Sequence, residues 1–424
     1  QQAEAVQTVN GPMLILAGAG SGKTKVLTCR IAHLLNQGVR PYRILAITFT
    51  NKAAAEMRER VDKMAGEAAK DVWLHTFHAF CAKLLRIEIH HLGQYTNNFA
   101  IYDTTDTKSL MKQILQEMNL DEKRYQPSAL IGRISNAKNQ LQTPEDYAKQ
   151  ASDFYDGKVA EIYAHYEAKL QQNNALDFDD LLLLTLKLLQ ENEEVRTKYQ
   201  DKFDYIMVDE YQDTNHAQYL LTKILAAKHK NICVVGDADQ SIYGWRGADI
   251  TNILDFEKDY PEAKLVKLEQ NYRSTQVILD AANAVIDNNT GRKPKNLWTD
   301  NGNGNQITYF RAIDERDEAR FVIEQIQALD SRPDVKLGDM AILYRTNTQS
   351  RVFEGMLIKS GIGYNIVGGT KFYERKEIKD IIAYLRVIFN PNDSLSLLRI
   401  INVPRRGIGD ATLAKLQAYA EENN

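Results

Sequence analysis

The fold of this chain is decided by the stretch A-G-A-G-S-G-K-T at residues 17–24. An apolar run over residues 13–16 leads into it, and a helical pattern over residues 25–35 follows. Glycines let backbone N–H groups come close to an anion, and the helix that follows adds unpaired N–H groups and a positive dipole end. The stretch therefore predicts a loop that binds the phosphates of a nucleotide triphosphate.

Two side chains at the end of this loop have the chemistry that such a site needs. Lys23 is expected to reach the β- and γ-phosphates, and the hydroxyl of Thr24 is expected to hold Mg²⁺. Ala17 stands where the strict pattern has Gly. A simple Gly/Ser-rich turn is the alternative, but G-K-T between a strand and a helix favours the phosphate site.

Length and composition describe an ordinary globular protein of several domains. The 424 residues predict two to four domains, with 44% hydrophobic and 26% charged residues. No apolar run approaches the length of a membrane span, and three distant cysteines predict reduced thiols in a cytoplasmic protein. A net charge of −3 argues against a generally basic nucleic-acid binder. The start at Gln1 and the end inside a helical pattern predict a fragment or an incomplete chain.

Strands alternate with helices on both sides of a long helical stretch. Residues 43–50 and 72–78 have the apolar pattern of buried strands, and residues 51–65 form an amphipathic helix between them. From about residue 80 to residue 199 the pattern is helical; strands resume at 205–210, 232–237 and 265–269. Such alternation predicts an α/β fold with a parallel sheet, interrupted by an inserted helical domain.

A second α/β region is expected after a loop over residues 293–305. Residues 307–310, 340–344 and 364–367 have the pattern of strands, with helical patterns between them. From residue 372 the pattern becomes helical again, which predicts the start of a second insertion.

Two carboxylates at the end of a predicted strand are expected to act together with the phosphate loop. Asp209 and Glu210 follow the apolar residues 206–208, and ligands of open α/β sheets bind beyond the carboxyl ends of the strands. Asp209 would hold Mg²⁺ together with Thr24, and Glu210 would deprotonate the water that attacks the γ-phosphate. A solvated strand end is the alternative for an acidic pair taken alone.

Three further positions predict what the nucleotide site is coupled to. Gln240 is suited to sense the γ-phosphate, although a polar strand-to-helix turn explains it equally well. The segment Y-G-W-R-G at residues 243–247 combines aromatic rings that stack on bases with an Arg that meets phosphate. In Q-N-Y-R-S at residues 270–274, Arg273 would stabilise charge on the γ-phosphate and Tyr272 would stack on adenine.

The ordered set of these segments resembles the superfamily 1 DNA helicases of the UvrD/Rep group. The resemblance runs along essentially the whole chain and is strongest at A-G-A-G-S-G-K-T (17–24), T-F-T-N-K-A-A (48–54), D-E-Y-Q-D-T-N (209–215), V-G-D-A-D-Q-S-I-Y-G-W-R-G-A (235–248) and Q-N-Y-R-S (270–274). The resemblance implies ATP and Mg²⁺ as cofactors and a 3′-to-5′ single-stranded DNA translocase that unwinds duplexes.

The same resemblance implies two RecA-like motor domains, each carrying an inserted, mainly helical domain. The first motor domain is expected at residues 1–100 and 193–272, with its insertion at 101–192. The second is expected at 273–372, incomplete, followed by the start of the second insertion at 373–424. The family's last two motifs fall beyond Asn424, so a polypeptide that ends there is expected to be an incomplete motor.

Residue roles implied by the resemblance divide between nucleotide and DNA. The nucleotide set comprises Gln2, Ala19, Gly20, Ser21, Gly22, Lys23, Thr24, Lys25, Asp209, Glu210, Gln240, Tyr272 and Arg273. The DNA set comprises Phe49, Thr50, Asn51, Thr76, His78, Tyr243, Trp245, Arg246, Arg345, Gly407 and Gly409. Lys25 stands where the family commonly has Arg, and the two do not donate hydrogen bonds alike.

The motifs also lead to expectations about the substrates, partners and location of the protein. Single-stranded DNA and single-strand/duplex junctions are the expected substrates, and accessory repair, replication or RNA polymerase proteins are the expected partners. The protein is expected in the cytoplasm, associated with the nucleoid, without contact to a membrane. An ATP-driven translocase that displaces proteins from DNA shares every motif; a nucleotide kinase or small-molecule ATPase would give Trp245 no role.

Overall fold

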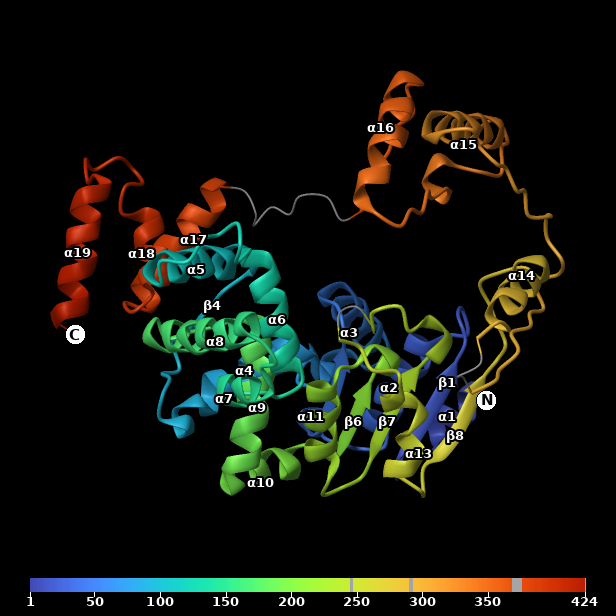
Figure 1. Ribbon diagram of the computed structural model, residues 1–424. Helices are drawn as coiled ribbons and strands as arrows, with labels where there is room; N and C mark the ends of the chain where they lie inside the picture. The colour runs from blue at the N-terminus through green and yellow to red at the C-terminus, as the bar shows by residue number, and fades with distance from the viewer. Residues whose placement is uncertain (245–246, 290–292, 368–375, 424) are drawn as a thin grey trace. The chain divides into compact units, whose positions relative to one another are not determined.

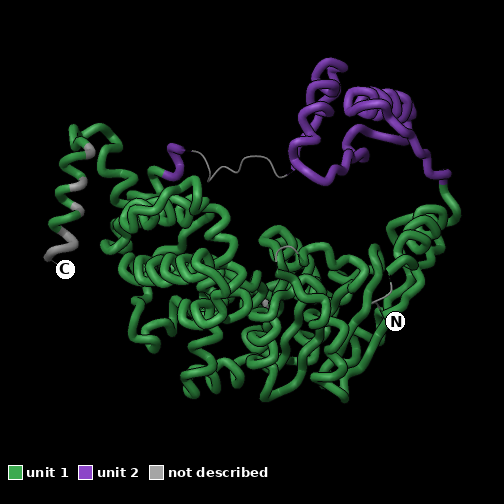
Figure 2. The backbone as a smooth tube through the Cα atoms, viewed as in Figure 1, with its two compact units in different colours: residues 1–304, 380–424 green, residues 305–379 purple. Residues whose placement is uncertain are grey.

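The computed structural model describes residues 1–244, 247–289, 293–367 and 376–423. They divide into two compact units, residues 1–304 with 380–424 and residues 305–379 (Figure 2). Across the described ranges, no helix is long and apolar enough to span a membrane.

A six-stranded parallel sheet forms the centre of the first unit (Figure 1). The strand order is β3-β2-β6-β7-β1-β8, and every pairing is parallel. The strands are β1 (Met13–Ala17), β2 (Ile44–Thr48), β3 (Trp73–Thr76), β6 (Tyr205–Val208), β7 (Ile232–Gly236) and β8 (Lys264–Leu268). Because all six strands point the same way, their carboxyl ends share one edge, where ligands of open α/β sheets bind.

The inner strands of the sheet are buried on both faces because their successive side chains enter different cores. In β1, Leu14 and Leu16 pack into one hydrophobic core, whereas Met13 and Ile15 pack into the other. The helices of this α/β part are α1 (Gln2–Gln7), α2 (Lys23–Asn36), α3 (Asn51–Ala65), α4 (Phe77–Glu88), α11 (His216–Ala226), α12 (Thr251–Leu254), α13 (Phe256–Asp259) and α14 (Gln276–Ile286). The predicted parallel α/β sheet is confirmed.

The predicted helical interruption of the sheet is also confirmed. It contains α5 (Thr104–Glu117), α6 (Pro127–Asn139), α7 (Pro144–Gln150), α8 (Phe154–Gln172), α9 (Phe178–Glu191) and α10 (Glu193–Lys202), with a short pairing of β4 (Ala100–Ile101) and β5 (Ala175–Leu176). Helices α5, α6 and α8 enclose a third core, whereas α9 contributes leucines to a core of the large sheet.

Residues 380–423 belong to the first unit and contact its helical part. This stretch contains α17 (Lys376–Phe389), whose first residues lie in the second unit, α18 (Ser394–Ile400) and α19 (Asp410–Asn423). Buried Asn390 donates from Nδ2 to the carbonyls of Asn173 and Asn174 at 2.9 and 3.0 Å, and Tyr102 donates its hydroxyl to Asp393 at 2.6 Å. The helical pattern expected after residue 372 is confirmed for the described residues.

The second unit differs from the expectation of a second sheet. It contains α15 (Glu315–Asp330) and α16 (Ser350–Lys359), and none of its described residues forms a strand. The expected strands at 307–310, 340–344 and 364–367 are therefore wrong for this structure. An apolar run predicts burial, but a strand also requires a hydrogen-bonded neighbour, and Leu343 and Val367 are each 89% exposed.

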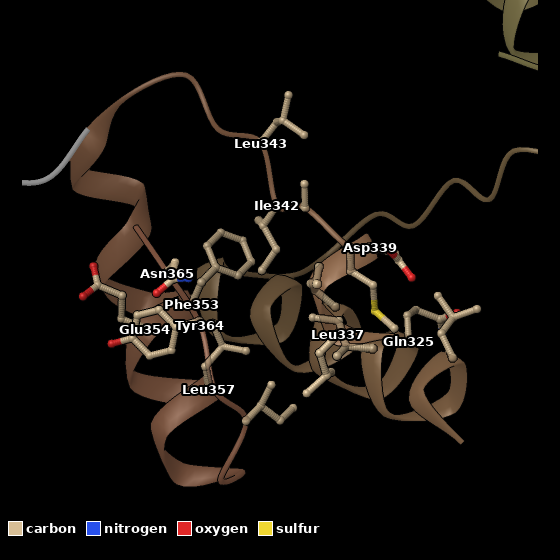
Figure 3. Close-up of a pocket in the computed structure, with 18 of the residues that line it drawn as sticks. Gln325, Leu337, Asp339, Ile342, Leu343, Phe353, Glu354, Leu357, Tyr364 and Asn365 are labelled. Atoms are coloured by element: carbon tan, nitrogen blue, oxygen red, sulfur yellow. The ribbon is translucent and has the colours of Figure 1, made fainter. Parts of the chain in front are cut away.

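A hollow of about 1550 Å³ occupies the second unit (Figure 3). Apolar side chains from α15, α16 and residues 335–344 and 362–367 line it, among them Leu337, Ile342, Phe353 and Leu357. None of the predicted nucleotide-binding residues lines it. The grouping of the chain into four domains stays a prediction.

Candidate functional site

The phosphate loop connects the buried strand β1 to helix α2. Gly20 and Gly22 have φ angles of +67° and +89°, in the left-handed region that favours glycine. A Cβ on Gly20 would lie 2.5 Å from Nδ2 of Asn271, so this position also needs glycine for space. Gly22 is the N-cap of α2 and places its first turn directly after the loop. The loop therefore presents backbone N–H groups at a helix N-terminus, as an anion site requires.

Lys23 and Thr24 lie beside the two predicted carboxylates. The ammonium of Lys23 lies 3.1 Å from Oε2 of Glu210, and the hydroxyl of Thr24 acts to lower the pKa of Asp209. Burial and the charge of Glu210 raise the pKa of Asp209 to about 6, although Lys23 and Thr24 oppose this. Lys23 and Thr24 follow strand β1, and Asp209 and Glu210 follow strand β6. The sheet thus brings together two pairs of residues that lie about 185 positions apart in the chain.

Glu210 has an unusual backbone. Its φ of 50° lies in the left-handed region, which non-glycine residues adopt at a cost of about 1–2 kcal/mol. Its carboxylate accepts hydrogen bonds from Lys23 and, at 2.9 Å, from Nε2 of Gln212. The strained turn therefore places the carboxylate beside the phosphate loop.

A hydrogen-bonded path continues from Glu210 to Gln240. Oε1 of Gln212 accepts the backbone N–H of Asp237 at 2.9 Å, and Asp237 follows strand β7. Oδ2 of Asp237 accepts from Nε2 of Gln240 at 2.6 Å. Gln212 is 1% exposed and was not assigned a role from sequence, although it stands within the quoted D-E-Y-Q-D-T-N segment. The path joins the predicted base to the predicted sensor.

The segment that contains Arg273 is hydrogen-bonded to the phosphate loop. Asn271 donates from Nδ2 to the carbonyl of Ala19 at 2.6 Å, and Tyr272 donates its N–H to the carbonyl of Gly20 at 2.9 Å. Oδ1 of Asn271 also accepts the N–H of Arg273 at 2.8 Å. Asn271 is the second functional residue that the sequence did not single out. Its side chain is buried, and its only signal in the sequence is its place inside the quoted segment Q-N-Y-R-S.

The remaining nucleotide residues surround the same loop. Nε2 of Gln2 donates to the carbonyl of Ser21 at 2.7 Å, which holds the start of α1 against the loop. The Ser21 hydroxyl donates to the carbonyl of Gly18 at 2.7 Å. Lys25 and Tyr272 are exposed.

Several predicted DNA residues of the first unit lie at or after the carboxyl ends of β2, β3 and β7. Thr50 caps α3 and Thr76 caps α4 by accepting N–H groups at 3.0 and 3.2 Å. Phe49 packs edge-on against Phe77, with ring centroids 5.6 Å apart. Asn51 and Tyr243 are exposed, and burial lowers the pKa of His78.

The other predicted DNA residues fall outside the described residues, in the second unit or in the loop before α19. Trp245 and Arg246 lie outside the described residues. Arg345 is an exposed residue of the second unit. Gly407 has a φ of +75° and lies with Gly409 in the loop before α19.

The residues that could hold a metal ion at the phosphate loop are Thr24 and Asp209. Over the part of the chain that is described, no group of three or more His, Cys, Asp or Glu side chains could hold a metal ion. The pair of Thr24 and Asp209 nevertheless fits Mg²⁺, which prefers oxygen ligands and usually keeps several waters. All three cysteines are free.

Comparison with known proteins agrees with the motifs. The UvrD/REP helicase N-terminal domain family matches residues 1–261, and the UvrD-like helicase C-terminal domain family matches residues 266–423. The chain is 58% identical over 425 aligned residues to proteins named ATP-dependent DNA helicase PcrA from Staphylococcus aureus (strain Mu50) and Staphylococcus epidermidis (strain RP62A). Each alignment covers 100% of this chain but 58% of the relative. The chain belongs to the UvrD/REP helicase family.

Proposed function

We propose that this chain provides the ATP-hydrolysing site of a DNA motor that moves 3′-to-5′ along single-stranded DNA and separates duplexes. The observation that carries the proposal is the hydrogen-bonded path from Lys23 through Glu210, Gln212 and Asp237 to Gln240. This path connects the cation, the base and the sensor that γ-phosphate hydrolysis requires. The relatives named ATP-dependent DNA helicase support the same reaction.

When a nucleotide binds, Lys23 would leave Glu210 for the phosphates, and this change would free Glu210 to act as the base. Lys23 pairs with Glu210 in this structure, and a bound triphosphate would compete for the same ammonium. When Lys23 turns to the phosphates, the Glu210 carboxylate becomes free to accept a proton from the attacking water. Thr24 and Asp209 would hold Mg²⁺, which neutralises phosphate charge when bound.

Arg273 and Tyr272 are proposed to complete the nucleotide site. The backbone bonds from Asn271 and Tyr272 to the loop keep this segment beside Gly20. Arg273 would stabilise charge on the γ-phosphate, and exposed Tyr272 would stack on adenine. Gln2 and Lys25 are proposed as further nucleotide contacts.

The DNA track is proposed at the ends of β2, β3 and β7. Caps at Thr50 and Thr76 start two helices there, beside the aromatic pair of Phe49 and Phe77. Aromatic rings stack on bases without reading sequence, which suits a translocase. The other proposed DNA residues are Asn51, His78, Tyr243, Trp245, Arg246, Arg345, Gly407 and Gly409.

The cellular setting is proposed by analogy with the reaction. A DNA motor of this kind would work in the cytoplasm at the nucleoid, with accessory repair, replication or RNA polymerase proteins as partners. Displacement of proteins from DNA without unwinding is the alternative use of the same motor.

ATP hydrolysis with and without single-stranded DNA tests the proposal in the natural full-length protein. Single-stranded DNA should raise the rate, Lys23→Ala should abolish hydrolysis, and Trp245→Ala should abolish the rise but keep the basal rate. A rate that DNA does not change would favour a small-molecule ATPase. Hydrolysis that survives Lys23→Ala would remove the proposed site.

A further inference from the structure

Residues 293–304, which we call the strap, follow helix α14 in the chain and lie against the nucleotide site. The backbone of Trp298 donates to Glu269 at 3.2 Å and accepts from Asn271 at 2.8 Å. Leu297 exchanges two hydrogen bonds with the side chain of Asn283, at 3.0 and 3.3 Å. A Cβ built on Gly18 would lie 2.0 Å from Cδ2 of Leu297, so the strap touches the phosphate loop itself.

Lys295 of the strap bridges two carboxylates of the turn that carries Gln240. Its Nζ contacts Oδ1 of Asp237 and lies 2.5 Å from Oδ2 of Asp239. The three side chains are 5%, 3% and 11% exposed, respectively. Removal of the ammonium would leave two like charges in a poorly solvated place, which is strongly unfavourable.

Asp237 links this buried cation to the sensor. Its Oδ1 accepts the N–H of Asp239 at 3.1 Å, and its Oδ2 accepts from Nε2 of Gln240 at 2.6 Å. Its own N–H donates to Gln212, which contacts Glu210. Asp237, whose carboxylate orients Gln240, is therefore held at its backbone N–H by Gln212 and at its carboxylate by Lys295.

We propose that Lys295 is a positioning residue for the γ-phosphate sensor: it holds Asp237 so that the turn at residues 237–240 keeps Gln240 in its working place. The proposal rests on the ATPase function proposed above. Lys295 acts through Asp237 and needs no contact with the nucleotide. Its loss should therefore slow hydrolysis and leave nucleotide binding nearly unchanged.

A matched control lies two residues away in the same strap. Lys293 pairs with Glu257 of α13, and within the described residues no hydrogen bond or ion pair joins either of them to the turn at residues 237–240. Lys293→Met removes the same charge from the same segment, so it measures the general effect of loosening the strap. Lys295→Arg keeps a cation and should restore most of the kcat that Lys295→Met loses.

The test measures kcat and KM for ATP in the natural full-length protein at saturating single-stranded DNA. Lys295→Met should lower kcat at least tenfold and change KM less than about twofold, Lys293→Met should change neither more than about twofold, and Lys295→Arg should recover most of kcat. In an Asp237→Asn background, Lys295→Met should cause little further loss, because the carboxylate that it serves is gone.

Two outcomes would overturn the inference while the proposed function stands. One is a Lys295→Met enzyme with wild-type kcat. The other is a Lys295→Met enzyme whose kcat falls and KM rises together, without recovery in Lys295→Arg, which would make Lys295 a structural cross-link. A wild-type protein that lacks DNA-stimulated hydrolysis would instead contradict the proposed function itself.

Discussion

At the scale of single residues, Glu210 combines three observations that are seldom found together. Its backbone is left-handed, its carboxylate pairs with Lys23, and the same oxygen accepts from Gln212. A strained backbone persists only where surrounding contacts hold it, and such positions cluster at functional sites. The geometry agrees with a base that is kept ready by its neighbours.

Glu210→Gln should separate nucleotide binding from hydrolysis. The amide oxygen can still accept from Lys23, but it cannot take a proton from water, so kcat should fall by about 10²–10⁴-fold. Affinity for a fluorescent ATP analogue should stay within about threefold. Loss of nucleotide binding would instead assign Glu210 to the metal or to the loop structure.

His75 of β3 predicts acid-sensitive stability. Burial, with the nearby charges of Lys83 and Arg58, lowers the pKa of His75 to about 4. The folded state therefore binds fewer protons than the unfolded state between about pH 6.5 and 4. Its neutral ring contributes stability that is complete above pH 6.5 and is lost as pH falls through 4.

His75→Asn should remove this part of the pH dependence. Allowing for the partial exposure of the ring, the contribution is about 1–2 kcal/mol. Urea unfolding at pH 7 and pH 4.5 should show a smaller loss for His75→Asn than for the wild type. Equal losses in the two proteins would show that His75 does not titrate as described.

At the scale of elements, a buried ion cluster joins three helices of the insertion. Lys138 of α6 lies 2.7 Å from Glu167 of α8 and contacts Asp177 and Asp180, at the start of α9, at 2.8 and 2.5 Å. Its side chain is fully buried, and the three carboxylates raise the pKa of Lys138 although burial opposes this. The Asp177–Asp180 run thus caps helix α9 and joins it to α6 and α8.

Lys138→Met should destabilise the insertion strongly. It leaves the buried carboxylates of Asp177 and Asp180 and the half-buried carboxylate of Glu167 without this cation, and removal of one partner of a buried pair costs about 3–5 kcal/mol. Lys169→Met is the control, because it removes a less buried cation that pairs with Glu117, and it should cost about 1 kcal/mol or less. Urea denaturation followed by circular dichroism measures both, and similar losses would contradict a special role for Lys138.

How much the sequence predicts differs between elements and side-chain networks. The phosphate loop, the acidic strand end and the sheet around them follow local patterns, so their ranges agree with the structure to within a few residues. Gln212, Asn271 and Lys295 could not be found in this way, since their partners lie 25 to 252 positions away in the chain. The strands expected within residues 305–367 are not formed. A periodic apolar pattern indicates which side chains are buried, but it does not show whether a neighbouring strand is present to form hydrogen bonds.

At the scale of the whole molecule, the nucleotide site is proposed to be one part of a DNA motor. The carboxyl edge of a single sheet carries the phosphate loop and the proposed base and sensor, and the proposed DNA-contacting residues Phe49, Thr50 and Thr76 lie at the ends of β2 and β3 in the same sheet. ATP hydrolysis can move DNA only if the nucleotide states differ in their affinity for DNA. The central claim is therefore directional movement that depends on Glu210.

Strand displacement on tailed duplexes tests that claim most directly. The natural full-length protein, with ATP and Mg²⁺, should release the short strand from a duplex with a 3′ single-stranded tail and leave a duplex with a 5′ tail intact. Glu210→Gln should release neither. Equal release from both tails, or release by Glu210→Gln, would contradict the account.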